Sequence, residues 1–192
     1  MKEILFSLKP YFYYLIGEGI KKIEVRKSCP KAKDWNNNAW FYMSKDEKSF
    51  SKIPKEYQEK YRKHFGKVGL KFTCDRIIEI GNYQEVDHSY MLWVKDKETT
   101  EKLCKNACLS EFEIQDYLGK NGGYGWHISK LKIYDKPKAL SDFRKPFPFN
   151  KECVECERGG DSYSSEDCSC CEYWSDKDIT RPPQSWCYVE GE

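Results

Sequence analysis

The stretch Gly19-Ile20-Lys21-Lys22-Ile23-Glu24-Val25-Arg26-Lys27 predicts the strand around which the rest of the chain is arranged. Ile23 and Val25 alternate in it with charged residues, and a period of two is typical of a strand that buries one face. We expect the apolar pair in a core and a charged row on the other face, made of Lys22, Glu24 and Arg26. Such a row suits an anionic or hydrogen-bonding ligand, and a solvated strand face is the alternative.

Charge and aromatic residues are unevenly spread along the 192 residues. The formal net charge is +2, but residues 1–80 hold 18 Lys and Arg against 10 Asp and Glu, whereas residues 151–178 hold 3 against 9. The chain also carries 14 Tyr, 10 Phe and 6 Trp. A basic, aromatic-rich half is compatible with contact to a polyanion and equally with a plain lysine-rich surface.

The apolar runs are short, and they predict no secretory leader and no membrane partner. The run Ile4–Phe6 is too brief for the apolar part of a leader, and the longest run, Tyr11–Ile16, has six residues. We therefore expect a cytoplasmic protein, in a bacterium or a phage-infected host cell. In a reducing compartment its ten cysteines are expected to be thiols or metal ligands.

The pattern of apolar residues predicts an α+β fold. Residues 45–65 and 98–118 are expected to be helical, the second with a capping box of Ser110 and Glu113, and a short helix should follow Pro10. A turn is expected at Asn36–Asn38. Strands are expected over residues 3–8, 39–43, 66–80 (with a bulge near Cys74), 126–134 and 183–189. Several strands with short helices between them favour a small mixed β-barrel.

The order of these pieces resembles ASCH domains, a group within the PUA-like superfamily, and in particular phage and prophage members. The resemblance is carried by Ile4–Pro10, by Gly19-x-Lys21-Lys22-x-Glu24-x-Arg26-Lys27, by residues 66–80, by 125–137 and by Pro182–Val189. It implies a PUA-like barrel made of residues 1–150 and 180–192, with 45–65 as a helical insertion and 151–178 as a cysteine-rich insertion.

The resemblance also implies a ligand cleft beside the first helix, in which related domains bind RNA or modified bases. Lys and Arg hold a phosphate or a base edge, and Glu accepts hydrogen bonds from an amino group. An aromatic face adds about 1 to 3 kcal/mol of stacking per base, here expected from Trp126. His127 is a further candidate, with a structural role as its alternative. The expected ligand-binding residues are Lys9, Lys21, Lys22, Glu24, Arg26, Trp126 and His127.

Two alternatives to a binding module stay open at this point. One similar bacterial branch is an amidohydrolase of N4-acetylcytidine, with a lysine where Lys21 stands and a threonine nucleophile where Glu24 stands. Ribonuclease activity is also known in the family, so Lys21 and Glu24 are the candidates for acid–base catalysis. The carboxylate of Glu24 in place of a hydroxyl disfavours the threonine-type mechanism. The other alternative is a phage accessory protein that binds a host protein through the acidic cysteine-rich segment.

The cysteine-rich segment predicts a structural zinc site. Cys153-x-x-Cys156 and Cys168-x-x-Cys171 are two pairs with the spacing of a four-thiolate zinc knuckle, because two intervening residues let both sulfurs reach one tetrahedral ion. Cys170 is a fifth thiol that can replace Cys168 or Cys171. Reduced cysteines in a loop, or a disulfide formed on oxidation, are the alternatives.

Overall fold

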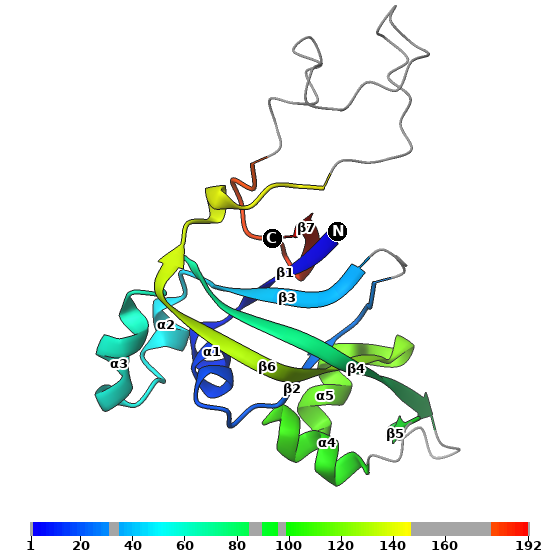
Figure 1. Cartoon of the computed structure of the whole chain (residues 1–192). Helices are drawn as coiled ribbons and strands as arrows, with labels where there is room; N and C mark the ends of the chain where they lie inside the picture. The colour runs from blue at the N-terminus through cyan, green and yellow to red at the C-terminus, as the bar shows by residue number, and fades with distance from the viewer. Residues whose placement is uncertain (1, 31–34, 85–89, 96–98, 147–177, 192) are drawn as a thin grey trace, which may run out of the picture.

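Seven strands form one sheet in the computed structural model, which describes residues 2–30, 35–84, 90–95, 99–146 and 178–191 (Figure 1). The strand order is β2-β6-β4-β3-β1-β7, and β5 pairs with β4. The strands are β1 (Lys2–Leu8), β2 (Ile23–Arg26), β3 (Trp35–Met43), β4 (Val68–Gln84), β5 (Tyr90–Val94), β6 (Gly123–Lys138) and β7 (Trp186–Glu190).

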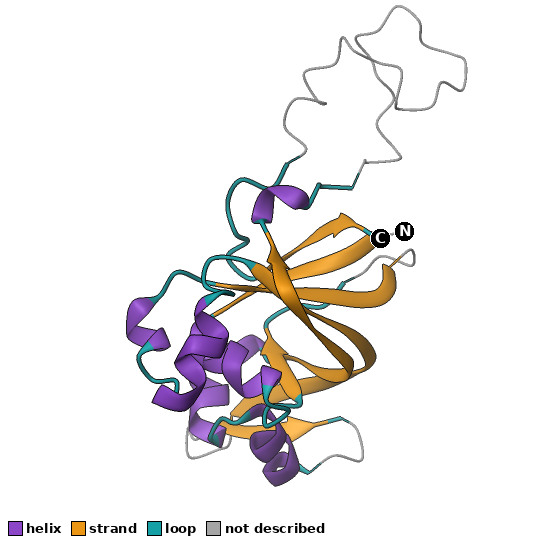
Figure 2. Cartoon of the chain, turned by 60° about the vertical axis from the view of Figure 1, so that its left-hand side comes forward, coloured by secondary structure: helices purple, strands orange, loops and turns teal. Residues whose placement is uncertain are grey.

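Short helices gather on one side of these strands (Figure 2). They are α1 (Pro10–Gly17), α2 (Glu47–Phe50), α3 (Lys55–Arg62), α4 (Thr100–Ala107) and α5 (Glu111–Leu118). The 3-10 turn η1 (Gly119–Asn121) follows α5, and a second one, η2 (Leu140–Asp142), follows β6 apart from these helices. The capping box at Ser110 is confirmed, since its side chain accepts from the Glu113 amide while the Glu113 carboxylate accepts from the Ser110 amide. The α+β class is confirmed. Within the described ranges, no helix is long and apolar enough to span a membrane.

The long strand β4 carries the centre of the sheet. It pairs with β3 through its first half, with β6 along most of its length, and with β5 at its end. The pairing with β6 shifts between Cys74 and Ile77, which confirms the predicted bulge and bends the strand there.

The sheet is not closed into a barrel. Strands β2 and β7 form its two ends, and no backbone pairing joins them in the described part of the chain. Side chains link the ends instead. Arg26 of β2 donates to the carbonyl oxygen of Ser7 (2.8 Å) in β1, and the Trp186 indole of β7 donates to the Ser28 hydroxyl (3.0 Å). We call this junction between β2, β1 and β7 the seam.

Strand β2 is buried on both faces, which differs from the half-buried strand that the sequence predicts. Ile23 and Val25 pack into a core with α4 and α5, as expected. Glu24 and Arg26 lie on the other face and are also buried, at 6% exposure each. The face that the sequence marks as polar is covered because α1 and β1 lie over it.

Candidate functional site

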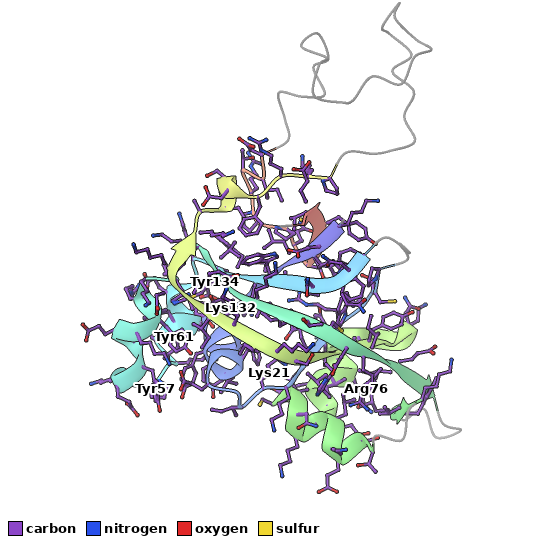
Figure 3. All side chains as sticks on the ribbon, viewed as in Figure 1. Lys21, Tyr57, Tyr61, Arg76, Lys132 and Tyr134 are labelled. Carbon is purple, nitrogen blue, oxygen red and sulfur yellow. The ribbon has the colours of Figure 1, made fainter. Side chains whose placement is uncertain are left out.

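The site is built on the turn that joins α1 to β2. Gly19 adopts a left-handed conformation with φ of 70°, which residues with a side chain rarely take. The Lys21 amide donates back to the Leu15 carbonyl (3.0 Å), so the turn stays against the end of α1. Lys21 is thereby brought beside Glu24 and Arg26 of β2. Figure 3 shows Lys21 between α1 and the α4–α5 pair.

Three charged side chains meet in this buried cluster. The Glu24 carboxylate lies 2.9 Å from the Arg26 guanidinium and 3.4 Å from the Lys21 ammonium. Lys21 is 2% exposed, and Glu24 and Arg26 are 6% exposed each. Two cations thus share one carboxylate away from water. We call Lys21, Glu24 and Arg26 the Glu24 cluster.

Lys21 is held at the end of a helix. Its ammonium donates to the Ala107 carbonyl at the last residue of α4 (2.6 Å), where a cation is favoured by the helix dipole, and it lies over the Phe12 ring (5.3 Å). Burial lowers the pKa of Lys21, while its attraction and hydrogen bond to Glu24 oppose that shift. A lysine with a lowered pKa holds its proton less firmly than an exposed one.

Arg26 crosses the seam and leaves one donor unused. Besides the Ser7 carbonyl, its guanidinium reaches the Ser185 hydroxyl at 3.5 Å and lies over the Phe6 ring at 5.2 Å. The Arg26 Nε has no hydrogen-bond partner among the described residues. Nor does the Nε1 of Trp126, which pairs directly with Glu24 across the sheet and so lies on the same face. The Glu24 cluster and the adjoining Trp126 therefore combine an excess positive charge with two buried, unused N–H donors.

Trp126 is not the exposed stacking platform that the resemblance implies. Its side chain is fully buried and packs edge-on against Phe6, with ring centroids 4.9 Å apart. The ring fills the core because β6 is a central strand of the sheet. Two half-buried tryptophans flank it, Trp35 at 5.4 Å and Trp186 at 6.3 Å. Neither was predicted as a site residue, although Trp186 lies in one of the motifs.

Besides Trp126, which borders the Glu24 cluster, three expected site residues lie away from it. Lys9 is exposed at the N-terminal boundary of α1, and Lys22 is exposed with its amide bonded to the Asn106 carbonyl (2.8 Å). His127 is partly exposed, and its Nδ1 lies 2.6 Å from the Asp75 carboxylate on the β4 bulge. The structure therefore brings together Lys21, Glu24, Arg26 and Trp126.

The predicted zinc ligands Cys153, Cys156, Cys168 and Cys171, with Cys170, lie outside the described residues. Among the described residues, no group of three or more His, Cys, Asp or Glu is arranged to hold a metal ion. Zinc stays a prediction, and metal analysis of protein purified without added zinc tests it. About one zinc per chain is expected, and well-folded protein without zinc would contradict it.

No protein-family model and no curated protein matches the chain. Two solved structures are similar to it. The crystal structure of ASCH from Zymomonas mobilis is 17% identical, with a TM-score of 0.47, over 98% of this chain and 87% of that one. A point mutant of the same protein is 16% identical, with a TM-score of 0.46, over 99% and 91%. Both are ASCH structures, the family that the sequence motifs resemble. Neither bears on the phage resemblance.

Proposed function

We propose that this protein binds a nucleotide of single-stranded RNA at the Glu24 cluster, with a modified base as the finer possibility. The observation that carries the proposal is the pair of unused buried donors, Arg26 Nε and Trp126 Nε1, next to two cations that share one carboxylate. A buried donor without an acceptor costs about 1 to 3 kcal/mol. Such a cost is explained if a ligand supplies the missing acceptors.

The chemistry of the cluster favours a nucleotide. Its excess positive charge suits a phosphate, the unused N–H groups suit carbonyl or ring-nitrogen acceptors of a base, and the Glu24 carboxylate accepts from an exocyclic amine or from a ring N–H group of a base. Trp35 and Trp186 are half-buried on either side of Trp126, so the stacking that we expected from Trp126 is assigned to these two rings.

Fluorescence anisotropy with a panel of labelled single-stranded RNAs at low salt tests the proposal. Arg26→Met removes the guanidinium and its unused donor, and we expect roughly tenfold weaker binding, because a hydrogen bond to a charged group contributes about 1.5 to 3 kcal/mol. Arg62→Met is the matched control, since it removes the same charge from an exposed position on α3. Equal affinity of the two variants, or no measurable affinity of the unaltered protein for any RNA, would overturn the proposal.

A hydrolase acting on a nucleoside or on RNA is the second candidate, and the state of Lys21 favours it. Its lowered pKa and its contact with Glu24 are what an acid–base pair needs. Glu24→Gln should then abolish turnover of acylated nucleosides or RNA while RNA binding persists. Absence of turnover on both substrates by the unaltered protein would leave the binding function alone.

A further inference from the structure

A polar cavity lies beside the pairing of β5 with β4, and part of its lining shares the face of the sheet that carries the Glu24 cluster. It has a volume of about 260 Å³, and its lining includes Trp93, Tyr124, Glu79, Lys27, Lys120 and the backbone of Gly81. The register of the strands determines on which face of the sheet the lining side chains lie. Tyr124 pairs directly with Arg26 on one side and with Glu79 on the other, so all three side chains leave the sheet in the same direction. We call this cavity the Trp93 pocket.

Trp93 presents one exposed side of its ring at this pocket. It pairs with Gly81 across β4 and β5, and its ring occupies the space that a side chain at position 81 would fill. The ring is 38% exposed, which is high for tryptophan and leaves a flat aromatic surface open to a ligand. Any side chain larger than hydrogen at position 81 would displace it.

The charges around the pocket favour an anion. Lys27 and Lys120 lie in its lining and are exposed, and the Lys27 ammonium is held over the Tyr117 ring at 5.4 Å. The carboxylate of Glu79 lies 2.6 Å from the Lys95 ammonium, which offsets its charge. Because Lys95 already balances Glu79, the charges of Lys27 and Lys120 leave the pocket with a net positive charge.

We infer that the Trp93 pocket is a second nucleotide subsite, in which a base stacks on Trp93 and the adjoining phosphate contacts Lys27 and Lys120. The inference rests on the proposed function, because it extends the RNA from the Glu24 cluster along one sheet face. Tyr124, which lines the pocket, is two residues from Trp126 on β6, about 7 Å along the strand, so the near edge of the pocket adjoins the Glu24 cluster while Trp93 lies farther out on β5. An aromatic surface beside lysines is the usual arrangement for single-stranded nucleic acid.

Binding of uridine monophosphate and of oligouridylates of increasing length separates the two sites. We expect Trp93→Ala to weaken binding of the longer oligouridylates roughly tenfold, the loss of one stacked base. The double variant Lys27→Ala/Lys120→Ala should also weaken it, because it removes the two cations assigned to the phosphate. Binding of uridine monophosphate, which needs the Glu24 cluster alone, should be unchanged. The double variant Lys52→Ala/Lys55→Ala is the matched control, because both lysines are exposed and α3 lies across the molecule from β5 (Figure 1). Trp93→Phe keeps a ring on Gly81 and should restore most of the affinity.

The outcomes distinguish this inference from the proposed function. If the pocket variants bind every oligouridylate like the unaltered protein while Arg26→Met does not, the second subsite is wrong and the first stands. If the pocket variants lose affinity while Arg26→Met keeps it, the Trp93 pocket is supported and the Glu24 cluster is not the RNA site. If Trp93→Ala alone loses affinity, with a lowered melting temperature and no effect of the lysine variants, the effect is one of folding and the subsite is overturned.

Discussion

Two buried glutamates on neighbouring parts of the sheet are held in different ways. Glu3 of β1 is 1% exposed, and its carboxylate accepts hydrogen bonds from the Trp40 indole and from the amides of Asn36 and Asn38 (3.3 Å each), with the Lys71 ammonium at 3.0 Å. One cation thus matches one carboxylate, and four groups donate to it. Glu24 instead lies between two cations, beside two N–H donors that have no acceptor in the described part of the chain.

If the proposed function holds, this difference separates a cluster that stabilises the fold from one that is kept for a ligand. Burial of a charge is tolerated when a counter-charge and hydrogen bonds compensate it, as they do around Glu3. Around Glu24 one cation lacks a matching carboxylate and two N–H donors lack acceptors among the described residues. Selection for stability alone would favour replacement of such a cluster. The comparison predicts that matched substitutions in the two clusters have different effects, on the free energy of unfolding for Glu3 and on RNA binding for Glu24.

The largest expected difference is between the two lysines. Lys71→Met leaves the buried Glu3 carboxylate without its cation, and we expect the free energy of unfolding to fall by about 3 kcal/mol. Lys21→Met leaves Glu24 paired with Arg26, so the free energy of unfolding should change by no more than about 1 kcal/mol, while RNA binding weakens. Methionine retains the apolar stem that each lysine packs on its neighbours. Urea unfolding of the two variants measures the difference.

The opposite result would end the comparison. If Lys21→Met destabilises the protein as much as Lys71→Met and leaves RNA affinity unaltered, the Glu24 cluster is structural as well. Glu56→Ala, at an exposed position on α3, is the control and should change the free energy of unfolding by no more than about 0.5 kcal/mol.

Acid pH acts on a third buried polar contact, in which, as around Glu3, the buried groups are hydrogen-bonded within the protein. His64 is 1% exposed, its Nδ1 lies 2.9 Å from the Tyr13 hydroxyl, and burial together with the charge of Lys63 lowers its pKa to about 4. The unfolded chain takes up this proton near pH 6.5, so the unfolded state binds more protons between these values. Stability should therefore fall as pH drops from about 6.5 to about 4, by roughly 3 kcal/mol at most, and then level off.

Urea unfolding at a series of pH values measures this loss. His64→Gln should remove most of the dependence in that window. A variant whose stability falls as steeply as that of the unaltered protein would assign the effect to carboxylates instead.

Much of the fold could be predicted from the sequence because local patterns determine it. The alternation of Ile23 and Val25, the capping box at Ser110 and the bulge near Cys74 each depend on neighbours within a few residues, and all three are confirmed. The expected turn at Asn36–Asn38 is present locally but does not separate two elements: Asn37 has φ of 65°, and the Asn38 amide donates to the Asn36 side-chain oxygen (3.0 Å). These residues lie within β3 (Trp35–Met43) as an irregularity in its pairing with β1, and two of their side chains donate to Glu3.

The site could be predicted only in part, for a related reason. Spacing places Lys21, Glu24 and Arg26 on one stretch, but their burial depends on how α1, β1 and the distant end of α4 pack around them, which the pattern of this stretch does not specify. The burial of Trp126 was not predicted for the same reason, because it depends on tertiary packing. Its motif marks it as aromatic and close to the cluster, but only the central position of β6 in the sheet shows that the ring is buried. Trp93 was missed because the pocket depends on its pairing with Gly81.

The smallest effect and the cleanest matched pair come from the two buried indoles. Trp40 donates through Nε1 to the Glu3 carboxylate, whereas Trp126 Nε1 has no acceptor among the described residues, and both rings are fully buried. Trp→Phe removes the same volume at each position, so the cavity cost is similar and the difference reports the hydrogen bond. We expect Trp40→Phe to lower the free energy of unfolding by about 2 kcal/mol more than Trp126→Phe.

Trp126→Phe should weaken RNA binding, because its N–H is one of the two donors assigned to the ligand, whereas Trp40→Phe should leave RNA affinity unchanged. Equal losses of stability together with equal RNA affinities would mean that the unused donor at Trp126 has no role in ligand binding.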